Sequence, residues 1–496
     1  MVCKDNLKRT AGILMPVASL PSECAVGGFG REAYAFVDSL ERMGITIWQI
    51  LPLNPLGYGN SPYQPYSSFA GDELYIDVRM LEQEGYLAPG SVTEMADADK
   101  KRVDYQAARA YKEPYLREAS REFWNMKADS AAFREFQAME WVYLYAVFMA
   151  LKKQNGLRCW NEWPREQQDW ILNKEYDIRH LEDEIRYQMF LQYEFYRQWN
   201  ELKRYANQKG IQIMGDIPFY VGIDSLDVWS CRENFLLDAE GKPSFVAGVP
   251  PDYFSETGQR WGNPIYNWEY LKENHFVFWL NRLSYSSKLY DILRIDHFRA
   301  FDTYWKIPAS CETAVEGEWV EAPGYELFDT VFAAMPDIQI VAEDLGDLRP
   351  EVLKLRDHYH FMGMNIVEFT FLSPEEPIEH QVIYTGTHDN QTVVGWYRGL
   401  DKETGKKVSQ KLHRYGKPWE SVGTKMLRYT FGSDACLAIV PAMDILEQDD
   451  SARLNTPGTV GSPNWEWRME SMEQLEHREK KVRKILMQSN RIRERG

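Results

Sequence analysis

The stretch Asp291-Ile292-Leu293-Arg294-Ile295-Asp296 is a short apolar run that closes on a carboxylate. Runs of the same kind recur at residues 12–17, 46–51, 211–216, 338–343, 364–370, 381–385 and 437–441. Apolar runs without strict alternation are typical of strands buried on both faces, as in a parallel sheet covered by helices. Because helical patterns lie between most of these eight runs, the sequence predicts an α/β fold, namely a (β/α)8 TIM barrel. In such a barrel the active site lies at the C-terminal ends of the strands.

The interval between the second and third runs is far too long for a single crossover helix. Strongly helical stretches occupy it at residues 115–127, 131–154 and 181–208. Apolar residues in the last stretch recur at spacings of three and four, which places them on one helix face. We therefore expect a single catalytic barrel over residues 1–496 with largely helical inserted subdomains, the main one at residues 75–205 between barrel strands 2 and 3.

The composition is that of a soluble globular protein, with 44% hydrophobic and 26% charged residues. The 57 Lys+Arg and 74 Asp+Glu give a net charge of −17. This balance argues against nucleic acid as the main partner, because phosphate binding needs a clustered basic face. The apolar run at residues 11–20 imitates a signal peptide, but Pro16 interrupts it, and the run at 141–151 is too short to span a bilayer. We expect no membrane association.

The cysteines indicate a reducing environment. Six of them stand at positions 3, 24, 159, 231, 311 and 436, and no two form a Cys-x-x-Cys pair. This spacing matches neither a zinc site nor a redox motif. Scattered thiols in a chain of this length fit the cytoplasm better than a disulfide framework does. We expect a cytoplasmic protein without a metal or an organic cofactor.

The acidic residues Asp296, Glu343, Asp344 and Asp389 stand where three predicted strands end. A carboxylate at the end of a buried strand is badly desolvated unless it is paired or used in chemistry. It can also cap the following helix, but three acidic clusters at consecutive strand ends favour a site. Adjacent residues on a strand point to opposite faces, so Glu343 and Asp344 cannot both aim into the site. The spacing does not choose between them.

Three carboxylates at one barrel mouth suit glycoside chemistry. One ionised carboxylate attacks the anomeric carbon and one carboxylic acid protonates the leaving oxygen, and a separation of about 5–5.5 Å favours retention. A third carboxylate can bind the sugar hydroxyls more strongly in the transition state than in the ground state. Arg294 beside Asp296 is expected to keep that carboxyl ionised. The alternative is a divalent metal site with a phosphate substrate, although no Gly-rich phosphate loop accompanies the acids.

Aromatic residues give a second signal, since 17 Trp, 29 Tyr and 23 Phe make up 14% of the chain. Most must lie in the core, but Tyr58, Tyr63, Tyr253 and Phe254 stand in turn-rich stretches where cores are not built. Exposed flat rings of this kind suit the apolar faces of glucose units, and nearby Asn, Gln and Asp suit the hydroxyls.

These stretches, taken together, resemble those of the amylomaltases, the 4-α-glucanotransferases of glycoside hydrolase family 77, which are related to the α-amylase superfamily. The matching stretches run nearly from end to end of the chain. Besides the three acidic clusters, they lie at residues 12–22, 61–65, 215–221, 248–254, 258–264, 453–458 and 464–468. Each stretch alone is a weak signal, whereas the set is specific.

The resemblance implies roles for individual residues. Asp296 would be the nucleophile, Glu343 the general acid/base and Asp389 the transition-state stabiliser. In the family, the loop that corresponds to Tyr253 and Phe254 is flexible and covers the acceptor side. The residues expected to bind substrate are Tyr58, Tyr63, Asp216, Tyr253, Phe254, Trp261, Arg294, His297, His388, Asn455 and Pro457.

The resemblance also implies a retaining transfer reaction without a cofactor. The expected partners are α-1,4-glucans, such as maltooligosaccharides, amylose and dextrins from starch or glycogen, with glucose as an acceptor. An α-1,4-glucan hydrolase that uses the same carboxylates is the alternative, because the sequence discriminates poorly between water and a sugar hydroxyl as acceptor. A non-catalytic glucan-binding protein would lack at least one of the three carboxylates, and all are present. The sequence does not indicate chain-length preference or oligomeric state.

Three positions depart from the family pattern. Ala300, Asp72 and Leu454 stand where Gly, Asn and Met are usual. None is one of the three carboxylates, so we expect these differences to affect the sugar subsites and product size, and to leave catalysis intact.

Overall fold

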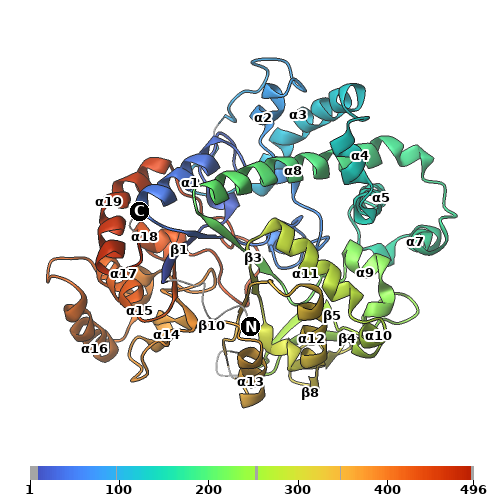
Figure 1. Ribbon diagram of the computed structural model, residues 1–496. Helices are drawn as coiled ribbons and strands as arrows, with labels where there is room; N and C mark the ends of the chain where they lie inside the picture. The colour runs from blue at the N-terminus through green and yellow to red at the C-terminus, as the bar shows by residue number, and fades with distance from the viewer. Residues whose placement is uncertain (1–8, 97, 252–254, 347, 493–496) are drawn as a thin grey trace.

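The computed structural model describes residues 9–492 except 97, 252–254 and 347, and the side chain of Tyr58 lies outside the description. Its centre is a parallel eight-stranded sheet (Figure 1). The strands are β1 (Thr10–Leu14), β2 (Ile47–Gln49), β3 (Gln212–Ile217), β6 (Ile292–Ile295), β9 (Ile340–Ala342), β10 (Gly363–Ile366), β11 (Gln381–Tyr384) and β12 (Leu437–Pro441). Neighbours in the sheet follow chain order, and β12 pairs with β1. A bridge from Val341 to Met362 links the β9 and β10 edges, so the sheet is nearly closed and the predicted barrel fold is confirmed.

Each of the eight apolar runs overlaps one barrel strand, but the boundaries differ by up to four residues in seven of them, and only β12 coincides with its run. The run at residues 364–370 shows why. Strand β10 ends at Ile366, and helix α14 (Val367–Thr370) begins at the next residue. A short apolar run does not distinguish a buried strand from a buried helical turn, so the run alone could not give this boundary.

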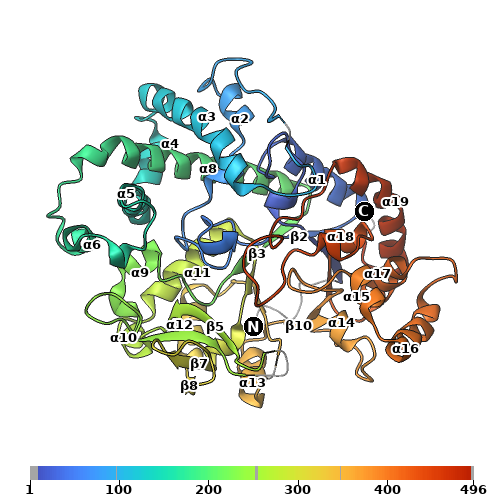
Figure 2. The same cartoon turned by 180° about the vertical axis from the view of Figure 1, so that it is seen from behind.

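Helices surround the barrel (Figures 1 and 2). Helix α1 carries its apolar residues Phe36, Val37 and Leu40 on the buried face and packs against α19, where Arg42 donates to Glu479 at 2.9 Å. The other helices outside the β2–β3 interval lie between later strands or follow β12. Together with α14, the helices outside this interval are α1 (Arg31–Met43), α9 (Leu226–Ser230), α10 (Trp268–Glu273), α11 (Val277–Leu289), α12 (Gly324–Ala334), α13 (Pro350–His358), α15 (Val393–Gly399), α16 (Lys402–Leu412), α17 (Val422–Gly432), α18 (Ala442–Ile445) and α19 (Met472–Gln488).

Seven further helices lie between β2 and β3 and form the upper part of Figure 1. They are α2 (Val78–Gln83), α3 (Tyr105–Met126), α4 (Ala131–Gln137), α5 (Glu140–Gln154), α6 (Arg165–Gln168), α7 (Trp170–Asn173) and α8 (Glu182–Gln208). Helix α8 packs on α3 and α5, and its fully buried Trp199 donates to the carbonyl of Leu289, just before β6. That these helices are an insertion into the barrel stays a prediction.

A second sheet was not predicted from the sequence. It is antiparallel, in the order β5-β4-β7-β8, with strands β4 (Phe245–Val249), β5 (Gln259–Pro264), β7 (Thr303–Pro308) and β8 (Glu318–Glu321). Strands β4 and β5 lie between β3 and β6 in the chain, and β7 and β8 lie between β6 and β9. Two successive connections of the barrel therefore combine into one sheet. It lies low in Figure 1, beside α10 and α12.

The first and last barrel strands are tied together by the end of the described chain. The buried guanidinium of Arg491 donates to five backbone carbonyls, including those of Thr10 at 2.6 Å, Phe431 at 2.6 Å and Ala435 at 2.8 Å. Charge-assisted hydrogen bonds to several carbonyls fix the segments that carry them. This arginine therefore joins β1 to the segment that enters β12.

No helix in the described part of the chain has the length and apolar character needed to cross a bilayer. The five described cysteines are free thiols, and Cys3 lies outside the described residues.

Candidate active site

Three of the predicted acidic residues stand at the C-terminal ends of barrel strands. Asp296 follows β6, Glu343 follows β9, and Asp389 lies in the loop after β11. Because the strands are parallel, these ends open on one mouth of the barrel. The carboxyls lie close enough to influence one another: after burial, the charge of Asp296 is the largest cause that raises the pKa of Glu343. The sheet thus gathers the acids that the sequence places far apart.

A buried arginine connects two of the carboxylates. Nη1 of Arg294, on β6, donates to both oxygens of Asp216 at 2.7 and 2.8 Å, and to Oδ1 of Asp296 at 3.1 Å. Only 4% of the Arg294 side chain and none of the Asp216 side chain is exposed. A cation this deeply buried is stable only when carboxylates and hydrogen bonds compensate its lost hydration. The arrangement therefore fixes the position of Asp296.

Tyr63 and His388 line the same region. The Tyr63 hydroxyl donates to Oδ2 of Asp216 at 2.7 Å and lies 3.4 Å from Nδ1 of His388. The two rings stack with centroids 5.1 Å apart. Nε2 of His388 lies 3.4 Å from Oδ2 of Asp389. These contacts form a continuous polar chain from Asp216 through Tyr63 and His388 to Asp389.

The structure separates the adjacent acids Glu343 and Asp344, a choice that the sequence spacing left open. The Asp344 carboxylate accepts from Met364 N–H at 2.7 Å and from Arg356 of α13 at 2.5 Å. Glu343 instead accepts two backbone N–H groups, from His297 at 2.8 Å and Leu345 at 3.0 Å. Asp344 is thus engaged in an ion pair with an outer helix, whereas Glu343 forms no ion pair with any cation in the described part of the chain.

Burial opposes the effect that Arg294 is expected to have on the pKa of Asp296. Burial is the largest effect and, together with Asp216, it outweighs Arg294, so the pKa of Asp296 is raised to about 6. Burial and then Asp296 raise the pKa of Glu343 to about 7. The two carboxyls titrate as an interacting pair. Near neutral pH one proton resides mainly on Glu343, and Asp296 is mostly ionised.

Asp389 stays ionised throughout this range. Burial acts to raise its pKa, but His388, Asn455 and Arg294 outweigh burial and lower the pKa to about 2. The expected sugar ligand Asn455 donates its side-chain Nδ2 to Oδ1 of Asp389 at 2.6 Å. Arg453, which sequence reasoning did not identify, donates to the Asp389 carbonyl at 2.7 Å. An arginine that contacts only backbone carbonyls carries no recognisable sequence signal.

His297 has an unusual backbone and an unoccupied ring nitrogen. It lies in the left-handed region at φ 55°, which is rare for a residue other than glycine and concentrates at functional sites. Its ring stands edge-on to Trp261, with centroids 4.9 Å apart, and its buried Nε2 has no hydrogen-bond partner among the described residues. Burial and then Arg299 lower the pKa of His297 to about 3. The ring is therefore neutral and can hydrogen-bond a polar ligand.

Some predicted residues are not placed in this cluster. Tyr253 and Phe254 lie outside the described residues, as does the side chain of Tyr58. Pro457 is exposed. Trp261 contacts the site through His297, and its carbonyl accepts from Gln64 at 3.3 Å.

The three departures from the family pattern are buried. Asp72 forms an ion pair with Arg109 at 2.8 Å and accepts from Leu56 N–H and Leu74 N–H, both at 2.9 Å. Ala300 and Leu454 are packed in the core. Asp72 thus has a structural role, because it closes the turn that leads toward α2.

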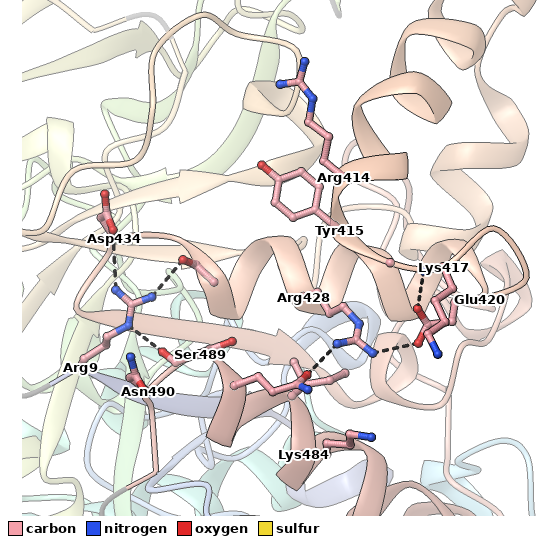
Figure 3. A pocket seen from close by; sticks show the side chains of 14 residues that line it. Arg9, Arg414, Tyr415, Lys417, Glu420, Arg428, Asp434, Lys484, Ser489 and Asn490 are labelled. Carbon is pink, nitrogen blue, oxygen red and sulfur yellow. Dashed lines mark hydrogen bonds and ion pairs between the residues drawn. The ribbon is translucent and has the colours of Figure 1, made fainter.

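A separate hollow of about 1000 Å³ lies between α17 and α19 (Figure 3). Arg9 donates to Ser489 O at 3.1 Å and Gly432 O at 3.0 Å, at the C-terminal ends of these helices. Arg428 donates to Glu420 and Gln488, both at 2.8 Å. Cations at helix C-termini satisfy the last carbonyls, so these arginines hold two helices together. None of the predicted site residues lines this hollow.

Within the described part of the chain, no group of three or more His, Cys, Asp or Glu side chains is arranged to hold a metal ion. The acidic residues of the barrel mouth are instead engaged with Arg294, His388, Asn455 and backbone N–H groups.

Comparison with known proteins gives one consistent result. A family model described as 4-alpha-glucanotransferase matches residues 15–474. The 4-alpha-glucanotransferase of Thermus thermophilus is 43% identical over 484 residues, which cover 94% of this chain and 95% of that protein. The 4-alpha-glucanotransferase of Streptococcus pneumoniae strain TIGR4 is 42% identical over 478 residues, 93% of each chain.

A solved structure agrees with these sequence matches. The amylomaltase from Streptococcus agalactiae, solved in complex with acarbose, superposes with a TM-score of 0.92. It is 38% identical in sequence, and the match covers 98% of this chain and all of the other.

Proposed function

The chain belongs to the 4-alpha-glucanotransferase family, glycoside hydrolase family 77, and from this premise we propose how its residues carry out the transfer. It moves a segment of an α-1,4-glucan from a donor chain to the 4-hydroxyl of an acceptor glucan or of glucose. The observation that carries the mechanism is the pair of carboxyls at the ends of the neighbouring strands β6 and β9: Asp296 accepts from the buried Arg294, whereas Glu343 accepts from the backbone N–H groups of His297 and Leu345. Environments that push two carboxyl pKa values apart assign the acid and the nucleophile.

In the first step, a carboxylate oxygen of Asp296 attacks the anomeric carbon of the donor. Glu343 gives its proton to the glycosidic oxygen as that bond breaks, so the shortened glucan leaves as a neutral alcohol. The product is a glycosyl ester of Asp296 with inverted configuration. Arg294 supports this step because it holds Asp296 in place at 3.1 Å.

In the second step, an acceptor's 4-hydroxyl replaces the departed chain. The Glu343 carboxylate, now without its proton, takes the hydroxyl proton while the oxygen attacks the anomeric carbon. The bond to Asp296 breaks, and the second inversion gives net retention. One α-1,4 bond is broken and one is made, so the reaction needs no energy source.

The remaining polar groups act on the sugar ring of the attacked glucose. Asp389 is ionised, so its negative charge stabilises the positive charge that develops on the sugar ring in the transition state. Asp216, Tyr63 and His388 form the polar chain beside it, and we assign to them the ring hydroxyls. Neutral His297 offers its unoccupied Nε2 to a further hydroxyl.

An α-1,4-glucan hydrolase with the same carboxylates is the alternative, in which water takes the acceptor's place. Family membership favours transfer. We assign the exclusion of water from the intermediate to closure of the aromatic loops at residues 58–64 and 250–254. The natural substrates on this proposal are maltooligosaccharides, amylose and dextrins from starch or glycogen, in the cytoplasm.

Incubation with maltotriose alone tests the proposal. We expect glucose together with a ladder of products longer than maltotriose, because one donor chain is extended at the expense of another. Products are separated by chain length and quantified over time. Glucose and maltose alone, in the equal amounts that hydrolysis of maltotriose gives, would show that the protein is a hydrolase. An unchanged substrate would contradict both activities.

The pH dependence of transfer follows from the two raised pKa values. We expect kcat/KM to fall below about pH 6, where Asp296 gains a proton and loses its nucleophilicity. It should also fall above about pH 7, where Glu343 loses the proton that the leaving group requires. Initial rates with maltotriose at low concentration, measured across this range, give both limbs. A rate that does not change with pH would contradict the assignment.

A further inference from the structure

We propose that Arg453 is a positioning residue for Asp389, and that it acts by clamping the loop after β11 to the segment that follows α18. The proposal rests on the proposed function of Asp389 as the transition-state stabiliser. It concerns a residue that touches no substrate atom, so its effect passes entirely through the placement of another side chain.

The clamp consists of two backbone carbonyls held by one guanidinium. Nη2 of Arg453 donates to the carbonyl of Asp389 at 2.7 Å, and Nε donates to the carbonyl of Asn455 at 2.8 Å. Within the described residues, no other group donates to the Asp389 carbonyl. The planar guanidinium fixes both bonds in one geometry, which a point charge cannot do.

Asn455 completes the clamp. Its backbone N–H donates to the His388 carbonyl at 3.1 Å, and its side-chain Nδ2 donates to Oδ1 of Asp389 at 2.6 Å. Arg453 thus holds the backbone of Asp389 directly, and holds its carboxylate through Asn455. Both the main chain and the side chain of Asp389 depend on the same arginine.

The segment that carries the clamp is itself anchored. Val103 N–H donates to Glu466 O at 2.7 Å, and the Tyr105 hydroxyl, at the start of α3, donates to Trp465 O at 2.7 Å. Arg468 N–H donates to Lys101 O at 3.0 Å. Trp465 N–H in turn donates to Leu454 O at 2.6 Å, so these contacts connect the clamp to the segment that leads into α3, the kind of support that placement of a catalytic group requires.

The geometry indicates a positional effect and not an electrostatic one. The pKa of Asp389 is lowered by His388, Asn455 and Arg294, and the two hydrogen bonds of Arg453 go to neutral carbonyls. Loss of the guanidinium should leave Asp389 ionised but displaced. Interactions made mainly in the transition state affect kcat and kcat/KM together, with little change in KM.

The test uses Arg453→Ala and Arg453→Lys in the full chain, with Arg398→Ala as the matched control. Arg398 pairs with Asp449 in the same segment after α18, and within the described residues its side chain makes no hydrogen bond or ion pair with Asp389 or Asn455. A displacement of about 1 Å can reduce rate by about 100-fold. We expect Arg453→Ala to lower kcat for maltotriose transfer by about 10- to 100-fold with KM within about threefold, and Arg398→Ala to match the wild type.

Three further readouts separate positioning from stability. We expect both limbs of the pH profile of Arg453→Ala to stay where they are in the wild type, and millimolar guanidinium ion to restore part of its kcat. Arg453→Lys keeps the charge and should remain impaired, because an ammonium group cannot reproduce the two fixed hydrogen bonds that the planar guanidinium makes to Asp389 O and Asn455 O. A wild-type kcat in Arg453→Ala would overturn the proposal. So would a loss of activity that parallels a loss of folded protein and does not respond to guanidinium.

An Asp389→Asn variant distinguishes failure of the clamp proposal from failure of the role proposed for Asp389. If it is inactive while Arg453→Ala is fully active, the clamp is wrong and the proposed function stands. If Asp389→Asn retains full activity, the role of Asp389 is wrong and the clamp proposal falls with it.

Discussion

Replacement of Asp296 by Asn should reduce maltotriose transfer by at least about 10⁴-fold while leaving glucan binding nearly unchanged. The amide cannot form the glycosyl ester, so the covalent route is closed. The exchange is close to isosteric and keeps an oxygen that can accept from Arg294. In the wild type, Nη1 of Arg294 lies 3.1 Å from Oδ1 of Asp296. Turnover is measured by product separation, and binding of maltooligosaccharides by calorimetry.

Asp291→Asn is the matched control for this experiment. Asp291 precedes β6, whereas Asp296 follows it, so the two positions lie at opposite ends of one strand. We expect the control variant to retain wild-type turnover. Unchanged turnover in Asp296→Asn would refute the nucleophile assignment.

Replacement of Glu343 by Gln should reduce transfer by about 10²- to 10⁴-fold, the range typical of a lost general acid/base. The deficit in the first step should depend on the leaving group. A donor such as glucosyl fluoride needs little protonation, so the first step should recover with it while the second step stays slow. The alkaline limb of the pH profile should disappear, because the group that titrates near pH 7 is gone.

Glu343→Gln should also be more stable than the wild type at neutral pH. The pKa of Glu343 is raised in the folded state to about 7, above its ordinary value. The folded protein therefore binds this proton more tightly than the unfolded chain does. The wild type loses stability as the pH rises from the ordinary pKa of 4.5 to the raised pKa of about 7. Urea denaturation at a pH below this interval and at a pH above it should show the advantage of the variant only at the higher pH.

Glu368→Gln is a matched control for the loss of a buried carboxyl. Burial, followed by Asp444, raises the pKa of Glu368 to about 9, so this group is protonated at neutral pH and glutamine resembles it closely. We expect wild-type transfer rates and an unchanged pH profile. A loss of activity as large as that of Glu343→Gln would mean that any buried carboxyl in this region is essential, and the acid/base assignment would fail.

The barrel could be predicted from the sequence because its strands are buried on both faces. A run such as Leu437–Pro441 is continuous, apolar and buried at every position, as a strand covered on both faces requires. The second sheet left no such signal, since the β5 segment carries Gln259, Arg260 and Asn263 among its residues and is only partly buried. Its pairing depends on two distant loops meeting, which no local pattern encodes.

The candidate site also has features that the sequence predicts and features that only the fold reveals. The acids could be predicted from their place after the strands and, for their roles, from the family resemblance. The choice between Glu343 and Asp344 could not, because it depends on whether Arg356 of a later helix reaches one of them. The raised pKa of Asp296 also required the fold, since burial exceeded the effect of Arg294, which the sequence alone places two residues away.

The pairing of β1 with β12 has a consequence for biosynthesis. Arg491 meets the carbonyl of Thr10, 481 positions earlier in the chain. A ribosome that adds about 5–20 residues per second releases β1 on the order of a minute before its second neighbour, β12, exists. During that time Ile13 and Leu14, both fully buried in the finished protein, stand on an unpaired edge. A nascent chain therefore exposes an apolar strand edge until almost the whole sequence has been synthesised.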